Sequence, residues 1–172
     1  MPIDVKPHAY DPATQPELFD GVLARRVVAF VIDFFVIATP VVLAAMFIFA
    51  FGVVTLGLGW ALYWLLSPAS VIWAIVYFGA TLGSERSATI GMRVMYLEMR
   101  TWYGVPAYFV LGAVHAIVFW LSISALTPFI LLVAFFNERR RLLHDIVLGT
   151  VVINNAQRAA ELRAVWANAR AG

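Results

Sequence analysis

Two long stretches of this chain carry no charged side chain, and this distribution of charge constrains the fold more than any other feature. No Asp, Glu, Lys or Arg lies between Asp33 and Glu85, a run of 51 residues, and a second such run of 37 covers residues 101–137. A helix that spans a bilayer needs ~20 mostly apolar residues. The first run is therefore long enough for two spans and a short turn, and we expect a protein integral to a membrane.

The composition supports this expectation and excludes several classes of protein. Hydrophobic residues make up 63% of the chain, whereas a soluble domain has roughly 45–50%. The net charge is only +2 and no basic stripe is interleaved with aromatic residues, so we expect no nucleic-acid partner. Cysteine is absent, which excludes disulfides, zinc thiolate sites and cysteine nucleophiles.

The chain also lacks the short motifs that carry chemistry. No phosphate-binding loop and no nucleophile–base pattern is visible, so we expect no cofactor and no enzymatic activity. The three histidines, His8, His115 and His144, are too scattered along the sequence to suggest a site, and no metal is expected.

Three parts follow one another along the chain. Residues 1–20 are polar and rich in proline, which is typical of a flexible segment. Residues 21–153 form the membrane domain. Residues 154–172 are expected to form a cytoplasmic C-terminal helix that is amphipathic, because apolar residues recur at helical spacing. These residues are Leu162, Val165, Trp166 and Ala169.

The fold class that we expect is an all-α membrane protein with two full transmembrane helices. The first covers about residues 27–50 and the second about residues 58–82, and glycines make residues 51–59 a tight, uncharged turn. Two apolar segments outside the spans, 93–99 and 150–153, predict a short two-stranded ribbon on the cytoplasmic face.

The third apolar region, residues 107–138, is too long for one untilted span and too short for two comfortable ones. Ser122–Pro128 interrupts it, and a proline disfavours helical geometry in the residue before it. We expect a kinked helical hairpin with arms of about 107–122 and 128–138. Two crossings and a re-entrant dip both remain open.

The basic residues indicate the orientation. All 12 Lys and Arg lie within residues 1–26, 86–100 and 139–170. The positive-inside rule places these three regions in the cytoplasm. Both termini are then cytoplasmic, and the third apolar region must return to the side from which it starts.

Asp33 lies inside the first apolar stretch, where a carboxylate is costly. Arg26 precedes it by seven residues, which corresponds to about 10 Å along a helix and nearly the same face. Asp33 is thus either paired with an arginine or protonated for part of the time. Two roles stay open with equal weight: a buried group that bonds a neighbouring helix, and a group that carries protons or ions.

Three motifs in order give the chain a family resemblance. They are Arg26–Asp33 (RVVAFVID), Thr89–Arg93 (TIGMR) and Arg139–Asp145 (RRRLLHD) followed by Gly149-Thr150. Over roughly residues 21–153 this pattern resembles the RDD family of bacterial membrane proteins, which is named for one arginine and two aspartates.

The resemblance implies a multi-pass protein of the bacterial cytoplasmic (inner) membrane. It implies that Arg26 is the family's arginine, with Arg25 as an alternative, and that Asp33 and Asp145 are its aspartates. Met92 stands where a lysine is common in the family. The family is mostly uncharacterised, with transport proposed for some members, so the resemblance says little about activity.

The acidic and basic residues at the cytoplasmic edge lead to one hypothesis about a site. We expect an interfacial ion network, because arginine and carboxylate groups pair with favourable geometry. An alternative for the three consecutive arginines is that they anchor the topology against anionic lipid heads. The network would join Arg26, Asp33 and Asp145 with one or more of Arg139, Arg140 and Arg141.

Three further residues are secondary candidates. His115 is the only ionisable group in the second uncharged run, and a neutral histidine bonded between helices is favoured over a proton carrier. His144 either orients its neighbour Asp145, titrates near neutral pH or, as we favour, packs at the interface. Gly91 is expected to permit a turn or a close approach of backbones.

The functional hypothesis that follows is a structural, assembly or accessory component of the inner membrane. The alternative is a small oligomeric transporter, or a cation/proton exchanger, that uses Asp33. Both hypotheses imply a lipid bilayer as the surroundings and either a homo-oligomer or a membrane-protein partner.

Overall fold

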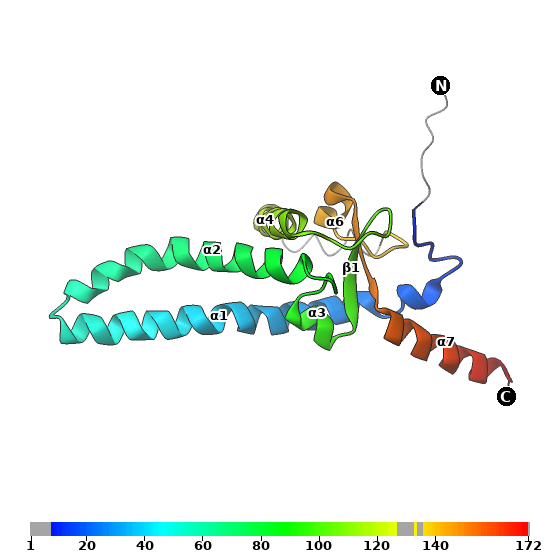
Figure 1. Ribbon diagram of the computed structural model, residues 1–172, viewed down its shortest axis with the longest axis horizontal. Coiled ribbons are helices and arrows are strands. Elements are labelled where there is room, and N and C mark those ends of the chain that lie inside the picture. The colour runs from blue at the N-terminus through cyan, green and yellow to red at the C-terminus, as the bar shows by residue number, and fades with distance from the viewer. Residues whose placement is uncertain (1–7, 127–132, 134–135, 172) are drawn as a thin grey trace, which may run out of the picture.

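The computed structural model describes residues 8–126, 133 and 136–171. Over these residues the protein is mostly helical, with one two-stranded antiparallel sheet. Figure 1 shows an elongated molecule, in which a long helical hairpin forms one end. The sheet, the shorter helices and both ends of the described chain lie at the other end.

The two longest helices form the hairpin. α1 is Val22–Val54 and α2 is Tyr63–Leu82, joined by a turn and by the 3-10 helix η2, Leu58–Leu62. Both stretches are long and apolar enough to cross a membrane, judged by length and composition. The two predicted spans are present as helices, and α1 extends beyond its predicted span at both ends.

Aromatic side chains near the turn pack back onto α1. The Trp60 Nε1–H donates to the Phe49 carbonyl oxygen at 3.3 Å, and the Tyr63 hydroxyl donates to the Ala45 carbonyl oxygen at 2.9 Å. A Cβ atom at Gly52 would lie only 1.8 Å from the Trp60 ring. A glycine is therefore required at position 52 for this turn to close.

α4, Phe109–Leu126, packs on α2 but runs in a different direction. Figure 1 shows it nearly end-on, whereas α1 and α2 lie along the picture. The first predicted arm, 107–122, is wrong at its end, because the helix continues through Ser122 to Leu126. The second predicted arm, 128–138, lies largely outside the described residues.

The sheet confirms the predicted ribbon and corrects its first strand. β1, Leu97–Thr101, pairs with β2, Thr150–Asn154, with Leu97 opposite Asn154. The first half of the predicted 93–99 strand is wrong, because Ile90–Val94 is the short helix α3. The Thr89 side chain caps α3 by accepting from the Met92 N–H, and this local bond favours helix over strand.

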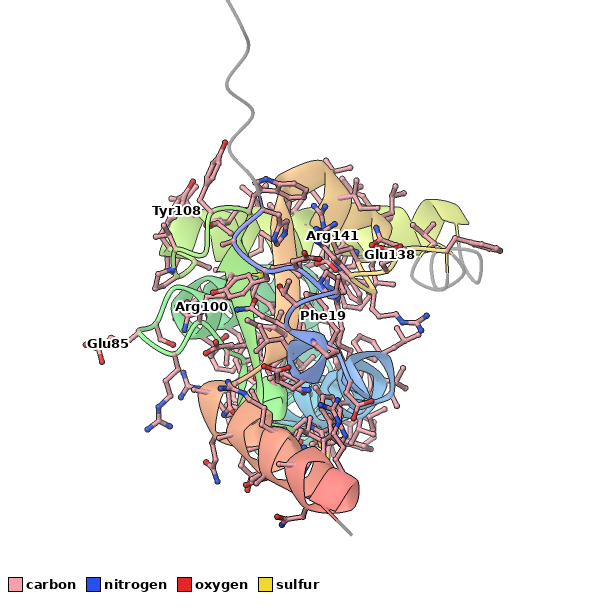
Figure 2. The ribbon with its side chains drawn as sticks, turned by 90° about the vertical axis from the view of Figure 1, so that its right-hand side faces the viewer. Phe19, Glu85, Arg100, Tyr108, Glu138 and Arg141 are labelled. Carbon is pink, nitrogen blue, oxygen red and sulfur yellow. The ribbon has the colours of Figure 1, made fainter. Side chains whose placement is uncertain are left out.

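We call the cap the assembly of α3, β1, β2, α6 (Leu143–Leu148) and the 3-10 helix η1 (Pro16–Leu18). Its centre is apolar and contains side chains that are completely or almost completely buried. In Figure 2, which looks onto this end of the molecule, Glu85 projects outward at the rim, whereas Arg141 lies among the other side chains. The buried apolar side chains include Leu97, Met99, Val151 and Ile153.

The last helix, α7, is Ala156–Ala171, which confirms the predicted C-terminal helix. Its apolar face is only partly used, since Ala159 and Leu162 are buried whereas Val165 is 61% exposed. The Arg163 guanidinium forms an ion pair with the Glu17 carboxylate at 3.0 Å. This pair joins α7 to η1, although the Arg163 side chain is largely exposed.

Candidate functional site

An ion pair between Arg26 and Asp145 joins the start of α1 to α6. The Arg26 Nη1 donates to the Asp145 Oδ2 at 2.6 Å, across 119 residues of sequence. The arginine side chain is 11% exposed and the aspartate side chain is completely buried. Two of the residues predicted for an ion network therefore meet, and their burial makes the pairing of each charge necessary.

The position of Asp145 in the first turn of α6 fixes its carboxylate. The Leu142 backbone N–H, at the start of the helix, donates to the Asp145 Oδ2 at 2.9 Å, as an acidic residue in this position commonly permits. Burial by itself would raise the pKa of Asp145, but the Arg26 guanidinium outweighs it and holds the pKa well below its ordinary value. Asp145 is consequently an anion at neutral pH.

Arg141 is buried beside this pair but binds backbone oxygens. Its Nε–H donates to the Thr150 carbonyl oxygen and its Nη2–H to the Asp145 carbonyl oxygen, each at 2.8 Å. Its guanidinium also lies over the Trp102 ring, 5.0 Å from the centroid, which is a cation–π geometry. Arg141 thus holds α6 against β2.

The other two consecutive arginines take different positions. The Arg139 Nε–H donates to the Tyr10 carbonyl oxygen at 3.2 Å, and the guanidinium lies 5.9 Å from the Trp102 ring centroid. Arg140 is exposed and has a left-handed backbone with φ +50°. The structure does not bring these two guanidinium groups to the Asp145 carboxylate.

Asp33 lies apart from the ion pair and is bound by neutral groups, which differs from the predicted network. Its Oδ1 accepts from the Tyr77 hydroxyl at 2.5 Å and from the Gly91 N–H at 2.8 Å. Its Oδ2 accepts from the Thr89 hydroxyl at 2.6 Å. The buried carboxylate therefore links α1 to α2 and to the first turn of α3.

Gly91 permits this link because two backbones meet at it. A Cβ atom at this position would lie 2.1 Å from the Ala29 carbonyl oxygen, a contact that only glycine avoids. The close approach expected from the sequence is present, and it brings the Gly91 N–H within reach of Asp33.

The two distant histidines that seemed too scattered for a site are neighbours. The rings of His115 on α4 and His144 on α6 lie 4.7 Å apart between centroids, nearly perpendicular at 88°. The nearest atom of the Asp145 carboxylate, Oδ1, is 3.9 Å from His115 Nε2 and 3.6 Å from His144 Nε2. Burial, the largest cause, lowers the pKa of His144 to about 3, so this ring is neutral at pH 7.

A cavity of about 450 Å³ extends from Asp33 to Arg26, which pairs with Asp145. Apolar side chains form most of its wall, as in many small-molecule sites. The polar residues that line it are Arg26, Asp33, Thr89, His115 and His144.

Four residues with structural roles at the site were given no role in the sequence, although Thr89 begins one of the three motifs. Tyr77 and Thr89 bind Asp33, Trp102 lies under two arginines, and the Asn154 side chain donates to the carbonyl oxygens of Glu17 and Asp20. The capping position of Thr89 before Ile90 was a usable signal. The other three depend on contacts between distant segments.

Two helices are long and apolar enough to cross a membrane, and together with the family match below they indicate a membrane-associated protein. The RDD family model matches residues 21–149. The chain belongs to the RDD family, as its three motifs suggested. No curated protein and no solved structure matches the chain.

Proposed function

We propose that this protein is a structural or assembly component of the bacterial cytoplasmic membrane, with the α1–α2 hairpin across the bilayer and the cap on the cytoplasmic side. The observation that carries the proposal is the use of its two buried aspartates. Each carboxylate binds donors from distant segments and thereby fixes how the helices and the cap fit together.

The dimensions of α1 support a crossing. The 21 residues from Phe34 to Val54 carry no charge, and a helix of this length measures about 30 Å, which matches the hydrocarbon thickness of a bilayer. Large apolar side chains on this stretch point outward, for example Phe47, which is 67% exposed. With the turn at the far interface, Asp33 lies at the cytoplasmic edge of the hydrocarbon.

The distribution of charge supports the placement of the cap. The ends of the described chain and the basic residues of the cap lie at the same end of the molecule (Figure 1), and the positive-inside rule assigns such an end to the cytoplasm. The hairpin leaves most of its apolar surface exposed. Lipid, a second copy of the chain or a membrane-protein partner would cover that surface.

The saturation of Asp33 favours the structural role over cation or proton exchange. A carboxylate that exchanges ions must release its protein partners in every cycle. Asp33 instead accepts three short hydrogen bonds, and its Thr89 and Tyr77 partners in turn accept from the first backbone N–H groups of α3. Releasing it would therefore leave several buried polar groups without partners.

Reconstitution separates the two roles. Wild type, Asp33→Asn and, as a matched control, Asp20→Asn are placed in proteoliposomes that contain a pH-sensitive dye, and Na⁺ or K⁺ gradients are applied. Asp20 is exposed, so its substitution removes one carboxylate without disturbing a buried bond. We expect equal proton leak for all three proteins, together with lower abundance and thermal stability for Asp33→Asn alone. A cation-driven proton flux that Asp33→Asn abolishes at full abundance would refute the structural proposal.

A further inference from the structure

The atoms of His115, His144 and Asp145 converge where α4 meets α6. One ring nitrogen of each histidine and one carboxylate oxygen of Asp145 all lie within 4.8 Å of one another. We propose that these three residues bind one Zn²⁺ ion, which would lock α4 to the cap.

The donor set fits zinc in type and number. Zinc binds imidazole nitrogen and carboxylate oxygen, and sites with three protein ligands keep a fourth position for water. The chain offers no thiolate, which removes the ligands that would favour copper(I) or an iron–sulfur cluster. The 450 Å³ cavity lined by both histidines provides room for the water and a route of entry.

The separations between donor atoms are close to those of a tetrahedral site. With zinc–ligand bonds of about 2.0–2.2 Å, ligand atoms lie about 3.3–3.5 Å apart. The distances from Asp145 Oδ1 are 3.6 Å to His144 Nε2 and 3.9 Å to His115 Nε2. Small rotations of the two rings toward the carboxylate would close this difference.

The imidazole rings have polar atoms that the protein leaves unused. The Nδ1 atoms of His115 and His144 are both buried and have no hydrogen-bond partner among the described residues. Their Nε2 atoms are beyond hydrogen-bond distance of Asp145 Oδ1. Buried polar groups in native proteins are nearly always bonded, so two idle rings that face one carboxylate require an explanation. A metal ion bound through the Nε2 atoms would use one nitrogen of each ring and would leave the Nδ1 atoms as they are.

The carboxylate is divided between two tasks. Asp145 Oδ2 is occupied by the Arg26 guanidinium and the Leu142 N–H. Oδ1 has the Thr150 hydroxyl at the outer limit of hydrogen bonding, 3.5 Å away, and remains open toward the histidines. The bonds to Oδ2 would hold the carboxylate in orientation, as outer-shell partners do at known metal sites.

Titration with Co²⁺ tests the site directly. The protein carries an affinity tag without histidine, is treated with a chelator and is titrated with Co²⁺ while its visible absorption is recorded. We expect one Co²⁺ per chain in a tetrahedral environment, displaced by stoichiometric Zn²⁺. His115→Gln and His144→Gln should each weaken binding by at least about tenfold, because even outer-shell changes cost 10–100-fold.

The third histidine provides a matched control. His8 contacts Tyr10 and Trp102 rather than the cluster, so His8→Gln should bind Co²⁺ as the wild type does. A chelator-treated melting curve for each variant checks folding, and if His144→Gln does not fold, His115→Gln decides. No saturable Co²⁺ binding by the wild type, or binding that persists in a folded histidine variant, would overturn the proposal.

This test is independent of the structural role proposed above. Zinc binding would stand even if Asp33 carried ions, and the structural role would stand even if the histidines bound no metal.

Discussion

The far half of the α1–α2 hairpin and the cap use their side chains in opposite ways. At the hairpin turn, Leu56 is 96% exposed and Leu58 is 82% exposed, and no charge is present. In the cap, Asp145 and Thr150 are completely buried, and Arg141, just before α6, is almost completely buried. A bilayer can stabilise the first region without specific contacts, whereas the second depends on the pairing of its polar groups.

The two regions should differ in how much stability a substitution costs. Apolar side chains that face lipid can be exchanged for others at little cost, because lipid tails and apolar side chains are alike. Buried polar groups cannot be changed one at a time, because each change leaves a partner unbonded. We therefore expect large effects in the cap and small ones along the hairpin.

Removal of the charge on Asp145 should have the largest effect. Asp145→Asn leaves the Arg26 guanidinium buried without its anion, and breaking a buried pair costs about 3–5 kcal/mol. Thermal or denaturant unfolding in nanodiscs measures the loss. Leu56→Asn is the matched control, since this position is exposed and has the left-handed φ of +53° that asparagine tolerates. Equal stability of the two variants would show that cap and turn do not differ.

A methyl group at Gly91 should have the next largest effect. In Gly91→Ala the new Cβ meets the Ala29 backbone, which has to move, and we expect a loss of about 3 kcal/mol. Gly149→Ala tests whether glycine loss alone matters, because its Cβ would meet no atom within 4 Å, although its φ of +62° adds strain. The melting temperature of Gly91→Ala should be the lower of the two.

Two tyrosine hydroxyls on α2 compare the end of the hairpin that meets the cap with the end at the turn, by the same chemical change. Tyr77→Phe removes a hydrogen bond to the Asp33 carboxylate, which should cost about 2 kcal/mol, as bonds to charged groups do. Tyr63→Phe removes a bond to the neutral Ala45 carbonyl on the hairpin and should cost no more than about 1 kcal/mol. Equilibrium unfolding of both variants measures the two losses in the free energy of unfolding. A larger loss for Tyr63→Phe than for Tyr77→Phe would contradict this expectation.

The smallest expected effect is a local response of the N-terminal segment to pH. Burial, followed by the charges of Arg139 and Arg141, lowers the pKa of His8 to about 4. The unfolded segment takes up a proton near pH 6.5, whereas the folded segment resists until about pH 4. The contribution of this segment to stability is therefore complete above pH 6.5 and is lost as the pH falls toward 4.

Hydrogen exchange measures this response. The amide of Tyr10, which donates to the His8 Nδ1, should exchange faster at pH 5 than at pH 7 after correction for the intrinsic rate. His8→Gln should remove the difference, because glutamine does not titrate. An identical pH response in His8→Gln would assign the effect to another group.

The sequence predicts the hairpin well because hydrophobic length is a local property. The spans, the glycine turn between them and the C-terminal helix follow from nearby residues, as does the extended pattern of the two segments that pair as β1 and β2. The start of β1 was misplaced because the Thr89 side chain, which accepts from the Met92 N–H, favours a helix at residues 90–94. The end of the first arm was misplaced because α4 continues through Ser122 to Leu126.

The sites were harder to predict because their partners come from distant segments. The pairing of Arg26 with Asp145 could be anticipated from their motifs, but the choice of neutral donors for Asp33 could not. Tyr77 contacts Asp33 across 44 residues of sequence, and no spacing rule predicts that contact. His115 and His144 are neighbours because α4 packs against α6. Their separation along the chain gives no sign of this packing.

A double-mutant cycle on Arg26 and Asp145 tests the central claim, that a buried ion pair fastens the hairpin to the cap. The stabilities of wild type, Arg26→Gln, Asp145→Asn and the double variant are measured in the same nanodiscs. We expect the double variant to be more stable than the sum of the single losses predicts, with a coupling energy above about 1.5 kcal/mol. A coupling energy near zero, with both single variants as stable as the wild type, would contradict the claim.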